Sequence, residues 1–120
     1  VPMDEFRPMT LRQKQSLFLS LVVLLVCEAK MRGYELTLGE AWRSPEEAAR
    51  LAKAGKGIQN SLHTLKLAVD LNLFKDGKYL TSTEAHRPLG EWWEQQHELC
   101  RWGGRFGDGN HYSLSHRGLA

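Results

Sequence analysis

The sequence predicts a single α+β domain in which helices cover one face of a small antiparallel sheet. Three observations support this prediction: apolar residues at helical spacing from Leu11 to about Arg32, alternating residue character from Leu65 to Phe74, and the tight-turn pair Asp76-Gly77 soon after. With 120 residues, of which 42% are hydrophobic and 25% charged, the chain is large enough for one core without disulfide bonds. No repeat or interdomain linker divides it.

The first predicted helix, Leu11 to about Arg32, is interpreted as a core helix and not as a membrane span. Its unbroken apolar run, Leu21 to Val26, is short beside the roughly 20 residues that cross a bilayer, and charged residues follow closely. Gly33 comes after a basic last turn and is a suitable end for the helix. Residues 1–8 do not resemble the rest of the chain, so we interpret them as a cloning remnant and 9–120 as the single domain.

A short strand is expected from Tyr34 to Gly39, followed by a helix with strong start signals. Ser44 suits the N-cap, Pro45 fits the first helical position and Glu47 completes a capping box, so we expect this helix to reach about Ala54. The basic, glycine-containing stretch that follows is typical of a loop, either solvated or lining a substrate path.

The second half of the chain is expected to continue the sheet and then add a further helix. After the turn, Lys78 to Leu80 completes a hairpin, and Pro88 to about Leu99 is typical of a helix with tryptophan anchors. We interpret His86 and His97, in or near this helix, as non-ligands because better candidates exist elsewhere.

The cysteines and the net charge argue against a disulfide-bonded protein and against a nucleic-acid-binding protein. Cys27 and Cys100 lie in segments that we expect to be helical, and free buried thiols explain them better than a disulfide. The net charge of +2, from 16 basic and 14 acidic residues, is too weak and too little clustered to predict nucleic-acid binding.

Candidate metal ligands lie at the edge of the alternating segment. The alternation directs Asp70 away from the more apolar face, and His63 lies just upstream in a stretch that can fold back toward it. An imidazole and a carboxylate are two ligand types of a catalytic zinc, which normally has a third protein ligand and an open water position. The glycine-rich segment near the end of the chain supplies Asp108 and His111, a further carboxylate and a further nitrogen. Each residue alone is equally explained by solvation or an ordinary hydrogen bond, so both explanations stay open.

Two motifs in a fixed order carry a resemblance to a known family. The chain has Ser61-x-His63 followed by Ala68-Val69-Asp70, and later Trp102-Gly103-Gly104 and Asp108-Gly109-Asn110-His111. In these motifs it resembles the zinc D-Ala-D-Ala carboxypeptidases, or VanY-like peptidases, and within them the small phage endolysins that are L-alanyl-D-glutamate peptidases. The similarity runs from about residue 11 to about residue 117.

The resemblance implies a hedgehog and D-Ala-D-Ala peptidase-like fold with a zinc cleft at the sheet. One zinc per chain would be held by His63, Asp70 and His111, with Asp108 as the general base that takes a proton from the attacking water. Some relatives have glutamate at the position of Asp108.

The resemblance also implies residues that contact substrate. Arg43, which lies between the predicted strand and helix, would bind a substrate carbonyl or carboxylate, although an ordinary surface arginine is the other explanation. Ser61 and Trp102 would line the cleft.

The expected function is cleavage of the bacterial peptidoglycan stem peptide by a phage endolysin during host lysis. Two alternatives remain: a D-alanyl-D-alanine carboxypeptidase that trims stem-peptide termini, and a zinc-containing wall-binding domain without activity. We expect a monomer that is not inserted in the membrane. Because the sequence has no recognisable export signal, we expect it to stay in the host cytoplasm until a separate pore-forming protein opens the membrane.

Overall fold

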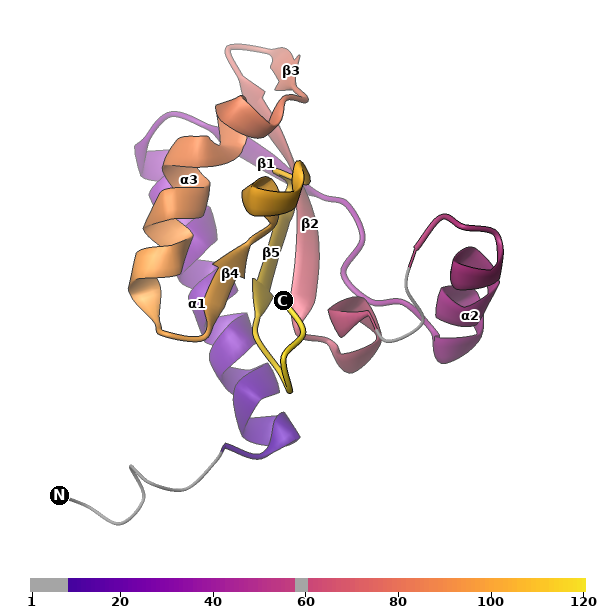
Figure 1. Cartoon of the computed structure of the whole chain (residues 1–120). Helices are drawn as coiled ribbons and strands as arrows, with labels where there is room; N and C mark the ends of the chain where they lie inside the picture. The colour runs from indigo at the N-terminus through magenta and orange to yellow at the C-terminus, as the bar shows by residue number, and fades with distance from the viewer. Residues whose placement is uncertain (1–8, 58–60) are drawn as a thin grey trace, which may run out of the picture.

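The structure is a computed structural model that describes residues 9–57 and 61–120 (Figure 1). Its three helices and five strands follow the order α1, β1, α2, β2, β3, α3, β4, β5, with two short 3-10 helices, η2 and η3. The helices are α1 (Leu11–Met31), α2 (Pro45–Lys53) and α3 (Thr83–Gln96), and the 3-10 helices are η2 (Leu62–Leu65) and η3 (Gly103–Phe106). The strands are β1 (Glu35–Leu38), β2 (Ala68–Lys75), β3 (Lys78–Leu80), β4 (Cys100–Trp102) and β5 (His111–Leu114). The interpretation of residues 1–8 as a cloning remnant concerns residues outside the described ranges, so it stays a prediction.

The sheet is antiparallel throughout and is built around β2. Its order is β1-β2-β5-β4, and β3 pairs with the end of β2 through the predicted hairpin. Asp76 and Gly77 at the tip both have positive φ, 52° and 76°, as a two-residue hairpin turn requires. These features confirm the predicted α+β class with a small antiparallel sheet.

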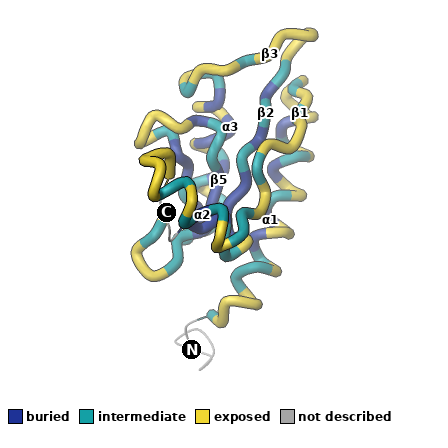
Figure 2. The backbone as a smooth tube through the Cα atoms, turned by 90° about the vertical axis from the view of Figure 1, so that its right-hand side faces the viewer, coloured by how far each residue is buried: buried dark blue, intermediate teal, exposed yellow. Residues whose placement is uncertain are grey.

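Helices α1 and α3 lie against one side of the sheet, and α2 lies on the opposite side, set apart from the sheet (Figure 1). The tube in Figure 2 is most deeply buried along the central strands. The hydrophobic core lies between the sheet and helices α1 and α3 and includes Phe18, Leu21 and Leu25 of α1, Leu89 and Trp93 of α3, and Val69, Leu71, Leu73, Tyr112 and Leu114 of the sheet.

The alternation predicted around Asp70 is confirmed within β2, but the strand begins later than expected. Val69, Leu71 and Leu73 are buried, whereas Asp70, Asn72 and Phe74 are half-buried. The segment before it forms η2 instead of strand, and Lys66 closes this 3-10 helix in a left-handed conformation with φ 60°. A left-handed residue turns the chain sharply, so it cannot continue a strand.

Helix α1 matches the predicted bounds and buries only one stripe. Thr10 forms a capping box with Gln13, while Val23 and Leu24 from the apolar run are exposed. Among the described residues, no helix is long and apolar enough to cross a membrane.

The start predicted for the last helix, at Pro88, was wrong. Helix α3 begins at Thr83, where the Ser82 hydroxyl accepts a hydrogen bond from the Ala85 amide at 3.1 Å. Pro88 is tolerated inside the helix because the carbonyl that loses its partner belongs to the exposed residue Glu84 near the helix start. The predicted start of α2 is confirmed, since the Ser44 hydroxyl accepts from the Glu47 amide at 3.0 Å.

The cysteine predictions were partly wrong. Both thiols are free within the part of the chain that the structure describes, but Cys27 on α1 is exposed. Cys100 is buried as expected, yet it begins β4 and is not in a helix.

Candidate metal centre

Asp70 and His111 are brought together by strand register. They are directly opposed in the antiparallel pair of β2 and β5, so their side chains project to the same side of the sheet. The His111 Nδ1 atom lies 3.2 Å from Asp70 Oδ1. Residues forty-one positions apart in sequence therefore meet because the two strands pair in this register.

His63 reaches the same point from η2. The Ser61 hydroxyl caps this 3-10 helix by accepting the His63 amide at 3.2 Å, and the side chain of His63 is only 4% exposed. Its Nε2 atom lies 3.4 Å from Asp70 Oδ1. The two imidazole rings meet edge to face, with centroids 5.1 Å apart.

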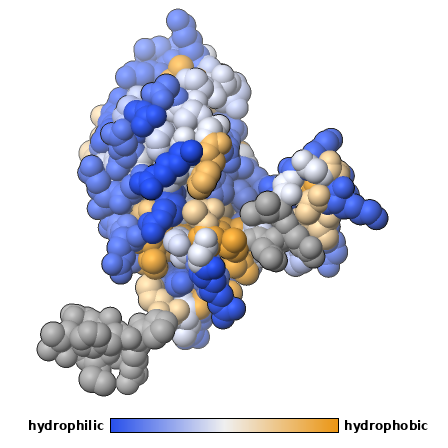
Figure 3. Space-filling view, in the orientation of Figure 1, coloured by the Kyte–Doolittle hydropathy of each residue, from blue (hydrophilic) through white to orange (hydrophobic). Residues whose placement is uncertain are grey.

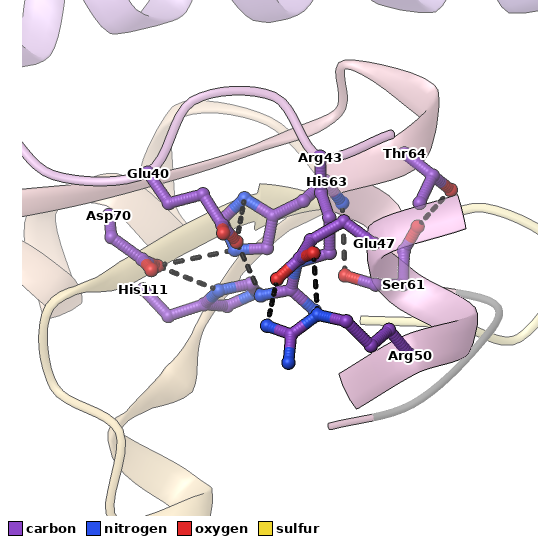
Figure 4. Close-up of polar contacts among 9 residues, drawn as sticks. All are labelled: Glu40, Arg43, Glu47, Arg50, Ser61, His63, Thr64, Asp70 and His111. Atoms are coloured by element: carbon purple, nitrogen blue, oxygen red, sulfur yellow. Dashed lines mark hydrogen bonds and ion pairs between the residues drawn. The ribbon is translucent and has the colours of Figure 1, made fainter. Parts of the chain in front are cut away.

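These three side chains fit a metal ion by donor type and spacing. One ligand atom from each of His63, Asp70 and His111 lies within 4.8 Å of the others, which is the spacing of atoms around a shared cation (Figure 4). Two imidazoles and one carboxylate form a donor set that zinc uses in catalytic sites. Partial burial opposes ionisation of Asp70, but hydrogen bonds from His111 and His63 lower the pKa of its carboxyl to about 2. The carboxylate is therefore ionised and ready to bind a cation across the physiological range.

Glu40 lies beside this group of three side chains, although it was missed from the sequence. The Asp70 amide donates to the Glu40 carbonyl and the Gly39 amide donates to the Asp70 carbonyl, both at 2.8 Å. The Glu40 Oε1 atom lies 3.6 Å from His63 Nδ1 and forms an ion pair with Arg43 (Figure 4). The signal in the sequence is an acidic residue directly after a strand and three positions before an arginine.

The three side chains of this cluster, His63, Asp70 and His111, open into a cleft of about 320 Å³. His63, Asp70 and His111 share its walls with Arg43, Ser61 and Asp108. Lys56, from the basic stretch that was expected to be either solvated or lining a substrate path, lines the same cleft. Phe106 also lines it and was not predicted; this residue is 78% exposed. Figure 3, in the orientation of Figure 1, shows a mostly hydrophilic surface on which apolar residues gather near the centre and toward α2.

Asp108 is held in the cleft by a tight loop. Its amide donates to the Gly103 carbonyl at 2.9 Å, and its carbonyl accepts from the His111 amide at 3.1 Å. Partial removal of its carboxyl from water raises the pKa of Asp108; nearby His111 lowers it and the Asp70 charge raises it, with a net upward direction. A raised carboxyl pKa suits a group that must take up and release a proton near neutral pH.

Trp102 does not lie where the sequence prediction placed it. Its side chain is 3% exposed and is not part of the cleft wall. The indole fills the space beside Gly90 and Gly104, where an added Cβ would come within 2.1 Å and 2.2 Å of the ring. Its Nε1 donates to the Gly109 carbonyl at 2.6 Å, so Trp102 supports the Asp108 loop from behind.

His86 and His97 lie away from the group formed by His63, Asp70 and His111, in agreement with their interpretation as non-ligands. His86 is buried and its Nδ1 atom is 2.9 Å from the Tyr112 hydroxyl, while His97 ends α3 and accepts from the Leu99 amide. Within the described ranges, neither joins a group of side chains that could share a metal.

Comparison with known proteins identifies the fold. No protein-family model and no curated protein sequence matches the chain. Among solved structures, the chain is similar to the Serratia marcescens L-Ala D-Glu endopeptidase ChiX, with a TM-score of 0.71 and 18% identity over 88% of this chain and 83% of that one. The chain therefore has the fold of this endopeptidase.

Proposed function

We propose that this protein is a zinc-dependent peptidoglycan peptidase that cleaves the stem peptide at the L-alanyl-D-glutamate bond. The observation that carries the proposal is the convergence of His63 Nε2 and His111 Nδ1 on Asp70 Oδ1, at 3.4 and 3.2 Å, beside a cleft that also contains Asp108. The likeness to the fold of an L-Ala D-Glu endopeptidase supports it. We expect one zinc per chain.

The metal would supply Lewis acidity and lower the pKa of a water to about 7. In our proposal, Asp108 accepts the proton of the attacking water and returns it to the leaving amine. A carboxyl with a raised pKa takes up a proton more readily than an ordinary aspartate does, which favours the first half of this exchange, the uptake of the proton from water.

Arg43 and Lys56 give the cleft two cationic side chains for an anionic stem peptide. We propose that Arg43 orients a substrate carbonyl or carboxylate, with Ser61 forming part of the adjacent wall. Because Arg43 already pairs with Glu40, substrate would contact the guanidinium from the cleft side.

In the endolysin role that we propose, a separate pore-forming protein gives the enzyme access to the wall. Mass spectrometry of a muropeptide digest separates the endopeptidase from its alternatives. Fragments cut between L-alanine and D-glutamate support the proposal, and loss of only a terminal D-alanine indicates the carboxypeptidase. An intact digest from a zinc-loaded protein that binds wall would favour the non-catalytic module.

Replacement of Asp108 by asparagine tests the proposed base. The amide keeps the side-chain size but cannot accept the proton, so turnover should fall by about 10²-fold or more, while zinc content and melting temperature stay near wild type. All three are measured on one preparation. A stable, zinc-replete variant that keeps a rate within a few fold of wild type would contradict this role.

A further inference from the structure

The His63 ring has two nitrogens with different surroundings. Nε2 faces Asp70 Oδ1 at 3.4 Å and is the nitrogen available to a metal. Nδ1 is buried and has no hydrogen-bond partner within the described residues, and the nearest carboxylate oxygen is Glu40 Oε1 at 3.6 Å. A buried polar atom without a partner is costly, so this gap indicates a contact that closes when the site is complete.

A metal can bind Nε2 only when the ring proton is on Nδ1, because a neutral imidazole carries its proton on one nitrogen and its lone pair on the other. We propose that Glu40 is a positioning residue that accepts a hydrogen bond from His63 Nδ1 and thereby holds His63 in the metal-binding tautomer. This inference rests on the metal site of the proposed function. Carboxylate partners of this kind orient metal-binding histidines generally.

A backbone hydrogen bond holds Glu40 in place beside Asp70. Its carbonyl accepts from the Asp70 amide at 2.8 Å, so the main chain of Glu40 is bonded to Asp70 while its side-chain Oε1 lies 3.6 Å from His63 Nδ1. A Cβ at Gly39 would lie 3.0 Å from the Asp70 carbonyl oxygen, so the glycine allows this close approach. Moving Glu40 would therefore disturb two of the three ligands.

Arg43 acts on His63 through Glu40. Its Nη2 forms an ion pair with the same Oε1 atom that faces His63, and its amide donates to the His63 carbonyl at 3.2 Å. The arginine thus brackets the carboxylate between its own side chain and the histidine. Glu40 lies beyond the Nδ1 edge of the ring, and it is not one of the residues whose ligand atoms converge on a common point.

The test uses Glu40→Ala, with Glu40→Gln as a conservative variant and Glu47→Ala as a matched control. Glutamine keeps an oxygen that can accept from Nδ1, whereas alanine removes it. Glu47 is also a carboxylate paired with an arginine, Arg50, but it does not contact His63. Its removal should leave every readout at the wild-type value.

Two readouts are needed, and neither depends on peptide hydrolysis. In metal-free, 15N-labelled protein, at a pH where the ring is neutral, long-range 1H–15N spectra report which nitrogen of His63 carries the proton. The Nδ1-protonated fraction should fall in Glu40→Ala, because only the Asp70 oxygen then remains as a close acceptor. Zinc affinity, measured by chelator competition, should fall about 10–100-fold in Glu40→Ala and less in Glu40→Gln.

If Glu40→Ala leaves both the tautomer populations of His63 and the zinc affinity unchanged, the inference is overturned. A lowered melting temperature of this variant alone would show only that Glu40 has a structural role. If wild-type protein binds no zinc, the proposed function fails, but the tautomer measurement still decides the role of Glu40. If zinc binds and the tautomer shifts while no muropeptide is cut, the inference stands and the proposed reaction does not.

Discussion

A single methyl group added at Gly103 should damage the proposed metal centre, although none of its proposed ligands is replaced. A Cβ at this position would lie 2.4 Å from the Asp108 carbonyl oxygen and 2.8 Å from His111 Cβ. To restore an ordinary contact of 3.4 Å, the Asp108 carbonyl must retreat by about 1 Å and His111 by somewhat less. The proposed base and one proposed ligand would therefore both leave their positions.

A misplacement of about 1 Å can cost on the order of 10²-fold in rate, and overpacking costs roughly 1–3 kcal/mol of stability. We expect Gly103→Ala to fold with a lowered free energy of unfolding, to bind zinc more weakly, and to hydrolyse muropeptides about 10²-fold more slowly per folded molecule. Denaturant melts, chelator competition and digest rates on one preparation provide these values.

Gly57→Ala is the matched control, because it lines the same cleft but its Cβ would meet its neighbours at 3.4 Å, an ordinary contact. It should behave like wild type in all three measurements. A Gly103→Ala protein with wild-type zinc affinity and rate would show that the loop adapts freely, and would refute the view that the Gly103 contact sets the geometry of Asp108 and His111.

Three further predictions follow from the site and the core. Removal of metal with a chelator should abolish hydrolysis, and added zinc should restore it; activity that persists in protein shown to be metal-free would contradict the zinc proposal. Burial lowers the pKa of His86, so below about pH 6.5 the unfolded chain binds a proton that the folded chain does not, and stability should decrease as the pH falls. His86→Gln should lose this part of the pH dependence in urea melts, and an identical slope in the variant would refute the assignment. Cys27 is exposed, whereas burial raises the pKa of Cys100 to about 11, so a maleimide at neutral pH should label Cys27 alone in the folded protein, as mass mapping would show.

The sequence alone determined the features that depend on neighbouring residues. The period of two around Asp70, the Asp76-Gly77 turn and the Ser44 cap each arise from local backbone preferences, and the structure confirms each of them. The two motifs also selected His63, Asp70 and His111 before any of them could be placed in space. The structure brings these three residues together: strand pairing places Asp70 opposite His111, and the Ser61 cap of η2 holds His63 beside them.

Tertiary structure decided the features that depend on distant parts of the chain. Trp102 is buried because Gly90 and Gly104, from different elements, leave room for its ring, and no local pattern reports that space. Glu40 joins the site because its backbone bonds to Asp70, thirty residues away, and this pairing depends on the packing of β1 beside β2. The sequence motifs select the candidate ligands, whereas long-range backbone pairing determines what surrounds and orients them.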